Sequence, residues 1–518
     1  MSDPFYLLVS KFTEVVVTNE VTKTDKARRK RTYSETINLK NAVNLILRTL
    51  WNDLYTIPRR DSSWSLHRPY YSSLEYRNIT PSDETTNHRE VNRVTNVLIN
   101  LGYVIITKEH NFDFVDKSKN RRRLHKPSKE LEELLLALND AGEIQIPSIH
   151  LFPNPTLNLI EFRKDKKVIK TPDNPVGSVG SRYEFQMGAI NKCLFESWPD
   201  LLLKDSEWAA LGKRLTTEHV DFSKRTLTRI FSNGSYDNTG RLYGAWWQTI
   251  PNKVPPENPE FIPYRKRITI DGRNTDELDY SALGPNIFYK LCNKDIGNED
   301  PYSRVFKDGK HRDLVKKGLN ALIMANTSLA RYCPKNKDLR ELLSKANEEL
   351  GWAKIETVGE VHASWRDLRK LIIKAHPDIA DQFGRGIGNV IQLEDSNLII
   401  KVMLRMAEKS IPVLSVHDSL IANWDVVESG ELLSQMEQAY YERFKKYIQI
   451  KGDPPMHGKP VESIIDYGGY ASPKDFLDYI DKTGEFKIWV NRQRLWKNNW
   501  STMIAKSDTL GEISSDKD

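Results

Sequence analysis

The stretch that most constrains the fold is the apolar run from Ile411 to Ala422, Ile-Pro-Val-Leu-Ser-Val-His-Asp-Ser-Leu-Ile-Ala. Apolar and β-branched residues on both sides of one polar pair, His417-Asp418, are typical of a buried strand or a tight hairpin. A carboxylate in such surroundings is unfavourable unless a positive charge meets it. The sequence therefore predicts that Asp418 either forms a structural ion pair with an Arg or Lys or holds a metal cation.

Length and charge suggest several domains and a polyanionic partner. The chain has 518 residues, enough for two to four domains at roughly 150 residues each. Its hydrophobic fraction of 39% is sufficient for true cores, so we expect a globular protein. The net charge is only +7, but cationic residues cluster at 26–31, 117–129 and 264–267. Such clusters make nucleic acid a fair candidate partner, although each one alone is typical of a solvated face.

Cysteine usage and hydropathy restrict the compartment. The three cysteines, Cys193, Cys292 and Cys333, are far apart in sequence, so we expect neither a disulfide framework nor a zinc module. This fits a reducing cytoplasm. No stretch approaches the 18 apolar residues of a membrane span, and we expect no membrane partner and no secretion signal.

The first third of the chain predicts a DNA-binding unit. Residues 1–36 are expected to form a short strand pair and a basic arm. Helical spacing predicts helices over 37–54 and 87–101, the second ended by Gly102. Strands at 103–107 and 111–115, a basic segment and a helix starting near 127–128 follow.

This order of helix, two-stranded wing and basic residues is typical of a winged-helix domain. Residues of the 87–101 helix would then face a DNA groove, and the basic segment would lie near phosphates. An ordinary α+β accessory domain with a solvated basic wing is the alternative. The residues concerned are Asn87, His88, Arg89, Asn92 and Arg93 on the helix and Arg121, Arg122 and Arg123 in the basic segment.

Further along, residues 144–163 contain probable strands, and residues 165–180 are rich in Lys, Pro, Gly and Asp, which favours a linker. Beyond it comes Asp237-Asn-Thr-Gly240-Arg241. Gly240 allows a sharp turn and Arg241 could reach a phosphate, although many surface turns share the pattern. We expect Trp246 and Trp247 in the core rather than stacked on bases.

A second cluster places an acidic residue at a strand end. Strands are expected over 267–270 and 276–281, joined by a turn at Asp271-Gly272, with a helix over 282–292. Asp279 then lies near the end of the second strand. A carboxylate there is either a metal ligand or the N-cap of the helix.

A third cluster is a cationic helix face. In the helix expected over 311–324, Arg312, Lys316 and Asn320 are four residues apart and share one face. Within this helix the two cations have no acidic neighbour four residues away, and they repel each other, which a triphosphate or plain solvent would relieve. A further helix, over 392–408, precedes the apolar run.

Two acidic residues on separate strands and one cationic helix face are what two-metal phosphoryl transfer requires. The motifs that carry these residues resemble the polymerase core shared by A-family DNA polymerases and bacteriophage-type single-subunit RNA polymerases. Asp279-Tyr280-Ser281 resembles motif A, Arg312 with Lys316 motif B, and His417-Asp418-Ser419 motif C in the form that RNA polymerases carry. The segment from Asp237 to Arg241 resembles the element that lies against the template hybrid in RNA polymerases. The resemblance covers about residues 230–425.

The resemblance implies roles for individual residues. Asp279 and Asp418 would ligate two Mg²⁺ ions, with Mn²⁺ as an alternative. Arg312 and Lys316 would hold the triphosphate, and Lys316 would protonate the departing pyrophosphate. The implied nucleotide pocket also contains Tyr280, Gly284, Asn320 and Met324, and the implied nucleic-acid contacts include Asp237, Gly240, Arg241 and His417.

The chain departs from the family pattern at the nucleotide pocket. Gly284 replaces the Glu with which DNA polymerases crowd a 2′-hydroxyl, so ribonucleotides would have space to enter. Met324 stands where the family usually has Tyr. The short intervals between motifs imply a compact fingers region, and no proofreading exonuclease is recognisable upstream.

The sequence thus predicts an α+β protein: a right-hand polymerase (palm and fingers) with an N-terminal winged-helix-like domain. The expected units are strands and a basic arm (1–36), the winged-helix-like domain (37–142), strands and linker (143–180), the polymerase domain (181–470) and a helical extension with a frayed tail (471–518). The expected function is a DNA polymerase or primase-polymerase of a mobile element, plasmid or phage. Its partners would be a DNA template with primer or nascent strand, NTP or dNTP, and a replication accessory protein. The alternatives are a single-subunit RNA polymerase, a non-catalytic DNA-binding replication initiator and a metal-dependent phosphohydrolase.

Overall fold

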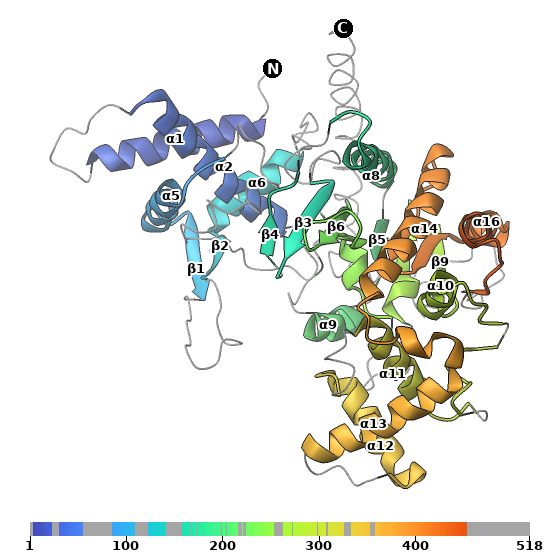
Figure 1. The fold of residues 1–518 in the computed structure, drawn as a ribbon. Coiled ribbons are helices and arrows are strands. Elements are labelled where there is room, and N and C mark those ends of the chain that lie inside the picture. Colours follow the sequence, from blue (N-terminus) through green and yellow to red (C-terminus); the bar gives the residue numbers. More distant parts are fainter. Residues whose placement is uncertain are drawn as a thin grey trace, which may run out of the picture.

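The structure, a computed structural model, describes residues 4–22, 31–54, 85–108, 123–140 and, with short gaps, 158–452. It is a mixed α+β protein, as expected (Figure 1). The strand expected over 111–115, the basic residues Arg121 and Arg122, and the extension expected over 471–518 lie outside the described residues.

The N-terminal part is a helical cluster with one hairpin, drawn in blue in Figure 1. Its apolar side chains form a core of their own, which Phe195 from a later helix joins. The strands pair antiparallel, with Val104 opposite Pro127. The elements are α1 (Pro4–Thr22), α2 (Tyr33–Leu54), α5 (His88–Asn100), β1 (Val104–Lys108), β2 (Leu124–Pro127) and α6 (Lys129–Asp140).

The strand pair expected near the N-terminus is wrong, because residues 4–22 form helix α1. The β-branched run in this segment favours strands, but Phe5, Val9, Phe12 and Val16 recur at intervals of four, three and four residues and are all buried. The Phe5 ring stacks on Trp51 of α2 with centroids 5.2 Å apart. Packing against α2 therefore overrides the local strand preference.

The expected helix over 87–101 is confirmed as α5, with ends set as the sequence indicated. The Asn87 side chain caps it by accepting hydrogen bonds from the backbone N–H groups of Arg89 and Glu90 at 3.1 and 3.2 Å. Gly102 follows at φ +79°, a conformation that glycine adopts without strain. The Asn87 side chain therefore serves as the N-cap of α5.

A four-stranded sheet has the order β4-β3-β6-β7. Phe162 of β3 and Phe231 of β6 stack at 5.5 Å within its small core. Its strands are β3 (Ile160–Lys164), β4 (Lys167–Ile169), β6 (Thr228–Ser232) and β7 (Thr239–Tyr243). Within the stretch predicted as a linker, residues 167–169 form β4, which pairs with β3, and α8 (Val179–Glu196) begins at its end.

The second sheet is the larger one, and its path is β10-β11-β9-β8-β5, with β12 also paired to β9. The hairpin predicted around Asp271-Gly272 is confirmed as β8-β9. Of the two alternatives for residues 411–422, a buried strand or a tight hairpin, the structure shows the hairpin β10-β11. The strands are β5 (Pro199–Leu201), β8 (Ile268–Ile270), β9 (Arg273–Tyr280), β10 (Leu414–Val416), β11 (Ser419–Asn423) and β12 (Ile450–Gly452).

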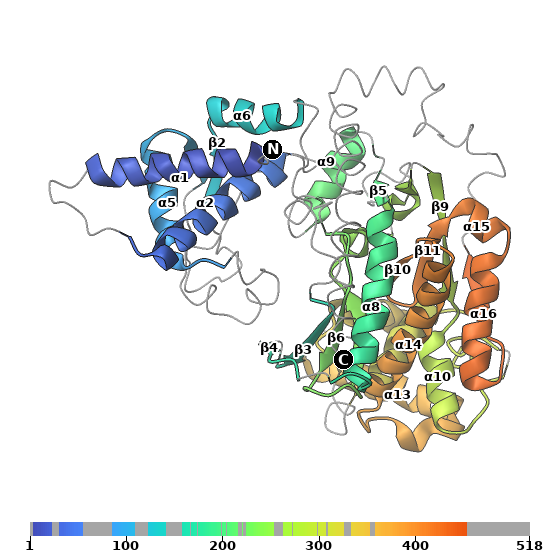
Figure 2. The same ribbon diagram turned by 90° about the horizontal axis from the view of Figure 1, so that it is seen from above.

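Helices cover this sheet and extend beyond it. Helix α14 packs against α8, α10, α16 and β7, and Figure 2 shows the four helices side by side. Helices α11, α12 and α13 pack on one another at the bottom of Figure 1. The helices are α9 (Asp205–Arg214), α10 (Leu283–Leu291), α11 (Arg312–Met324), α12 (Lys337–Leu350), α13 (Val358–Ala375), α14 (Gly388–Glu408), α15 (Trp424–Glu428) and α16 (Glu431–Phe444), with 3₁₀ turns η3 (Trp246–Thr249), η4 (Tyr264–Arg267) and η6 (Pro377–Gln382).

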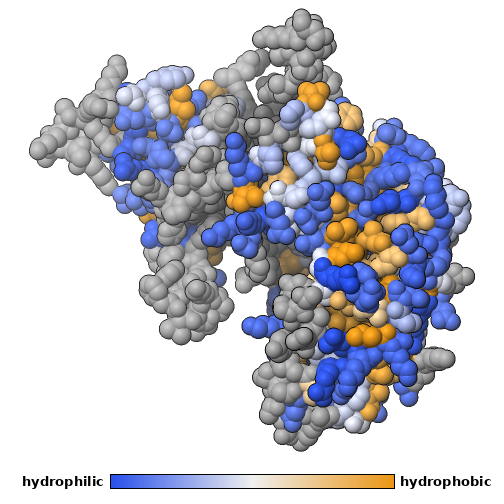
Figure 3. All heavy atoms as spheres, in the orientation of Figure 1, coloured by the Kyte–Doolittle hydropathy of each residue, from blue (hydrophilic) through white to orange (hydrophobic). Residues whose placement is uncertain are grey.

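The helices expected over 282–292, 311–324 and 392–408 are confirmed as α10, α11 and α14. Trp246 and Trp247 are buried in the main core, as expected. Apolar and hydrophilic residues alternate over the face seen in Figure 3. Among the described residues, no helix is both long enough and apolar enough to cross a membrane.

Candidate active site

The two acidic residues singled out in the sequence lie on neighbouring strands. Strand β11 pairs antiparallel with β9, and Ser419 lies directly opposite Asp279. Asp418 is the residue before Ser419, in the two-residue turn that joins β10 to β11. The turn needs a positive φ, which His417 adopts at +58°. Cross-strand neighbours are about 5 Å apart at Cβ, and Asp418 is next in sequence to the residue opposite Asp279, so the fold places the turn that carries Asp418 beside the end of β9.

The charge of Asp418 acts on the Asp279 carboxyl. The Asp279 side chain reaches solvent, yet partial burial and the negative charges of Asp418 and Glu277 raise its pKa to about 7. The positive charges of Lys316 and Arg265 oppose the rise. Two carboxylates that share a site disfavour each other's ionisation, and a cation between them would remove the conflict.

Neither carboxylate has the structural role that the sequence left open. The N-cap position of α10 is occupied by Ala282, so Asp279 does not cap that helix. In the part of the chain that the structure describes, neither Asp279 nor Asp418 forms an ion pair or accepts a hydrogen bond through its side chain. The nearby Arg241 is engaged elsewhere. Both acidic groups are therefore available to a ligand.

The cationic face of α11 is confirmed, and its two cations both lie over the ring of Tyr302. The Arg312 guanidinium lies 5.0 Å and the Lys316 Nζ 6.0 Å from the centre of the Tyr302 ring. Asn320 is hydrogen-bonded to the Tyr302 hydroxyl. Burial raises the pKa of that hydroxyl, and the charge of Asp418 raises it further. The face of α11 is thus directed toward the carboxylates.

Sequence patterns indicate neither Tyr302 nor one contact of Arg312. The carboxylate of Asp300 binds the Arg312 guanidinium at 2.6 and 3.1 Å. Helical spacing could not reveal this partner, because Asp300 belongs to the loop before the helix. Lys316 is exposed and forms no ion pair among the described residues.

Two more charged residues border the carboxylates. Glu277 lies two residues before Asp279 and hence on the same face of β9. Arg265, from the cationic run at 264–267, forms an ion pair with Glu277 at 2.5 Å, and the Ser419 hydroxyl donates a hydrogen bond to the same carboxylate. Because Glu277 is already neutralised, it is a less suitable metal ligand than Asp279. The alternation of acidic residues along the strand was the signal in the sequence.

The Asp237–Arg241 segment forms the turn into β7. Gly240 has φ +60°, and a Cβ there would lie 2.9 Å from Leu393, so backbone conformation and packing both require glycine. Arg241 forms an ion pair with Asp395, a buried residue of α14. Burial raises the pKa of the Asp395 carboxyl to about 6 against the effect of Arg241. Arg241 is thus held near Asp418 by a protein carboxylate, and Asp237 remains in the turn, where it accepts a hydrogen bond from Ser235 at 3.1 Å.

His417 is exposed beside this group, with its ring 6.3 Å from that of Tyr243. Partial desolvation and the charge of Arg241 lower the pKa of its imidazole, although Asp418 opposes the change. The side chain is therefore largely neutral at pH 7 and offers a hydrogen-bonding group rather than a positive charge.

Three residues of the expected nucleotide pocket remain, and one of them, Tyr280, does not face the site. A Cβ at Gly284, in the first turn of α10, would meet no atom within 4 Å. Met324 ends α11, is 43% exposed and packs on Gly388. Tyr280 does not line the site: its side chain is buried on the opposite face of β9 and donates to the Met436 carbonyl at 2.8 Å. Strand alternation places it there, because its neighbour Asp279 faces the site.

The expected DNA-contacting residues of the N-terminal cluster are only partly described. Arg89 is exposed at the start of α5. Arg93 forms an ion pair with Glu90 at 3.1 Å, and the amide of Asn92 donates to the His88 carbonyl within the helix. Arg123 directly precedes β2.

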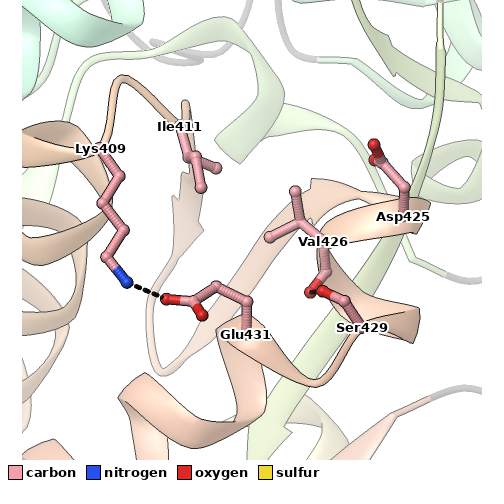
Figure 4. A pocket seen from close by; sticks show the side chains of 6 residues that line it. All are labelled: Lys409, Ile411, Asp425, Val426, Ser429 and Glu431. Atoms are coloured by element: carbon pink, nitrogen blue, oxygen red, sulfur yellow. Dashed lines mark hydrogen bonds and ion pairs between the residues drawn. The ribbon is translucent and has the colours of Figure 1, made fainter.

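An open pocket of about 350 Å³ lies at the far end of the β10-β11 hairpin from Asp418 (Figure 4). An ion pair at 2.5 Å between Lys409 and Glu431 closes one side of it. It holds none of the residues discussed above, and its lining consists of Lys409, Ile411, Asp425, Val426, Ser429 and Glu431.

Within the described ranges, no group of three or more His, Cys, Asp or Glu side chains is arranged to hold a metal ion. A site with two carboxylates suits Mg²⁺ only where a substrate supplies further oxygen ligands. No protein-family model matches the chain, and no curated protein matches it.

Proposed function

We propose that the protein is a template-directed nucleotidyltransferase, a DNA polymerase or primase-polymerase that extends or starts strands on a DNA template. The observation that carries this proposal is the pair of carboxylates at the end of β9 and in the β10-β11 turn, which have no ion-pair partner among the described residues, with the cationic face of α11 directed toward them. Phosphoryl transfer to a 3′-hydroxyl needs these two kinds of group on opposite sides of a nucleotide. Replication of a mobile element, plasmid or phage is the setting that we propose.

The proposed architecture is a polymerase right hand. The larger sheet with its covering helices would be the palm, and α11, α12 and α13 the fingers. Among the described residues of the N-terminal cluster, helices α1, α2 and α5 precede the antiparallel hairpin β1-β2, an element order typical of a winged-helix domain. Arg89 on α5 would then contact the DNA backbone or a groove.

Asp279 and Asp418 fit a pair of divalent cations. Asp418 lies next to the residue opposite Asp279, its charge adds to the effect of burial in raising the pKa of Asp279, and no cationic side chain of the described residues forms an ion pair with either carboxylate. Mg²⁺, or Mn²⁺ in its place, would lower the pKa of the attacking hydroxyl and stabilise charge on the α-phosphate and pyrophosphate. Asp279 and Asp418 would be its protein ligands.

The cationic face would act on the triphosphate. Arg312 presents two N–H groups in a fork that matches phosphate oxygens. Lys316, exposed and on the carboxylate side of the helix, would bind the same tail and give its proton to the leaving pyrophosphate. Asn320 would keep Tyr302 in place beneath both cations.

Substitution of one carboxylate tests the proposal. With purified protein, Mg²⁺, a primed DNA template and labelled NTPs or dNTPs, Asp418→Asn is expected to reduce incorporation at least about a hundredfold, because the ligand charge is lost. Asp425→Asn, in α15 just beyond the far end of β11, is the matched control and should leave the rate nearly unchanged. Equal incorporation by Asp418→Asn and wild type would refute the two-metal assignment. DNA binding without any incorporation by wild type would favour a non-catalytic replication initiator.

The open space at Gly284 supports the use of ribonucleotides. Because nothing lies within 4 Å of a Cβ at this position, Gly284→Glu should fold and place a carboxylate near the sugar. We expect the ratio of NTP to dNTP incorporation to fall about tenfold. Gly284→Gln adds similar bulk without charge and separates steric from electrostatic effects. An unchanged ratio in both variants would remove this support for a primase or RNA polymerase activity.

A further inference from the structure

Asp300, in the segment between α10 and α11, occupies the binding groups of Arg312 that a phosphate would use. Its Oδ2 is 2.6 Å from Nε and its Oδ1 3.1 Å from Nη2 of the guanidinium. A guanidinium offers the same two N–H groups to a carboxylate and to a phosphate. Arg312 therefore cannot donate these hydrogen bonds to a nucleotide while Asp300 accepts them.

Asp300 is itself held in place. The Ser303 hydroxyl donates to its carboxylate at 2.8 Å, and the Ser303 N–H donates to its carbonyl at 3.0 Å. Burial alone would raise the pKa of the Asp300 carboxyl, but hydrogen bonds from Arg312 and Ser303 hold it below its usual range. The loop thus presents a fixed negative charge to Arg312 at neutral pH.

The position of Arg312 does not depend on this ion pair alone. Its guanidinium also lies over the buried Tyr302 ring at 5.0 Å, a cation–π contact that remains when the carboxylate leaves. The side chains of Arg312 and Asp300 are 38% and 30% exposed. A ligand from solvent can therefore reach the pair and replace one partner without moving the other.

We propose that Asp300 is a positioning residue that exchanges with the polyphosphate at Arg312. It holds the guanidinium in the free protein, yields it to the triphosphate of the incoming nucleotide and takes it back as pyrophosphate leaves. The inference rests on the proposed function. Because Asp300 competes for Arg312, nucleotide and pyrophosphate each bind more weakly than they would to the cationic face without Asp300. The release of pyrophosphate is faster for the same reason.

Steady-state kinetics of Asp300→Asn test the exchange. The KM for NTP or dNTP and the inhibition constant for pyrophosphate should both fall about two- to fivefold, the range for a partly exposed ion pair, while kcat should not rise. Asp313→Asn is the matched control, because it removes the same charge one residue from Arg312 in an exposed position of α11. If Asp313→Asn lowers both constants as much as Asp300→Asn does, a general charge effect explains the result and the exchange is refuted.

A double-mutant cycle tests whether Asp300 acts through Arg312. Adding Asp300→Asn to Arg312→Gln should change neither constant further, because the shared partner is gone. A reduction as large as in the wild-type background would overturn the proposal. Should Asp300→Asn fail to fold, Ser303→Ala, which frees Asp300 from one hydrogen bond, should lower the same constants by a smaller factor; unchanged constants would then count against the exchange.

Calorimetry with inorganic tripolyphosphate and Mg²⁺ separates this inference from the proposed function, because it needs no turnover. Suppose that wild type incorporates no nucleotide but Asp300→Asn binds tripolyphosphate more tightly than wild type. This result would refute the proposed function and support the anion exchange. Incorporation by wild type with unchanged KM, inhibition constant and tripolyphosphate affinity in Asp300→Asn would refute the exchange alone.

Discussion

At the end of β9 and in the β10-β11 turn, the carboxylates of Asp279 and Asp418 have no cationic partner within the described residues, whereas on α11 the Arg312 guanidinium is bound by Asp300. The first arrangement leaves two like charges in mutual repulsion, which a divalent cation would relieve. The second supplies a counter-ion from the protein itself. The two carboxylates thus need a bound cation to have their charge neutralised. Arg312 is already neutralised, and a bound phosphate would only replace Asp300 as its partner.

The largest expected effect concerns Lys316, the cation of α11 without a carboxylate partner in the described part of the chain. Lys316→Ala should lower kcat about a hundredfold or more, since general-acid catalysis contributes roughly 10²–10⁴. Arg312→Ala should mainly raise KM, because the ion pair with Asp300 already offsets part of its charge. Single-turnover incorporation and steady-state kinetics measure both. A larger loss of kcat in Arg312→Ala than in Lys316→Ala would reverse the contrast between the two cations.

An intermediate effect is expected in the pH dependence of metal binding. The free Asp279 carboxyl has a pKa of about 7, and a metal ligand must be deprotonated. Mn²⁺ affinity should therefore fall about tenfold between pH 8 and pH 6 as a proton competes for Asp279. Titration followed by Mn²⁺ paramagnetic resonance measures this. Asp279→Asn should bind weakly with a shallower dependence; an equally steep curve in this variant would assign the titration to another group.

The smallest expected effect is on stability. Because folding raises the pKa of Asp279 from 3.8 to about 7, the folded state retains a proton that the unfolded chain releases. Stability from this group is complete below about pH 4, declines as pH rises toward 7 and stays lower above it. In EDTA, Asp279→Asn should thus be more stable than wild type at pH 8 by about 1 kcal/mol, a modest value because the side chain reaches solvent. The difference should vanish near pH 4. Thermal unfolding at both pH values measures it, and a destabilised variant at pH 8 would contradict the repulsion between the two carboxylates.

The sequence was sufficient to predict the helices and strands that carry the candidate site. The polar pair His417-Asp418 within an apolar run predicted a hairpin, and helical spacing placed Arg312, Lys316 and Asn320 on one face. These patterns are local, and local periodicity reports which face of an element is buried. Their mutual approach came from the family resemblance rather than from the spacing.

Contacts between distant segments were not predictable in the same way. Asp300 and Tyr302 belong to an irregular loop without periodicity, so nothing in the sequence linked them to α11. The ion pair of Arg265 with Glu277 joins a 3₁₀ turn to a strand. Helix α1 was mistaken for strands because its β-branched residues favour strands locally, and only packing against α2 decides the matter.

The position of β9 between β11 and β8 in the larger sheet has a consequence for folding during synthesis. Its pairing with β11 brings together residues as distant as Glu277 and Ser419, which are 142 positions apart. During synthesis, β9 leaves the ribosome long before β11 and β12, and until they arrive it presents an open edge to other chains. We therefore expect truncations that end between α11 and β11 to aggregate rather than to accumulate as shorter folded forms.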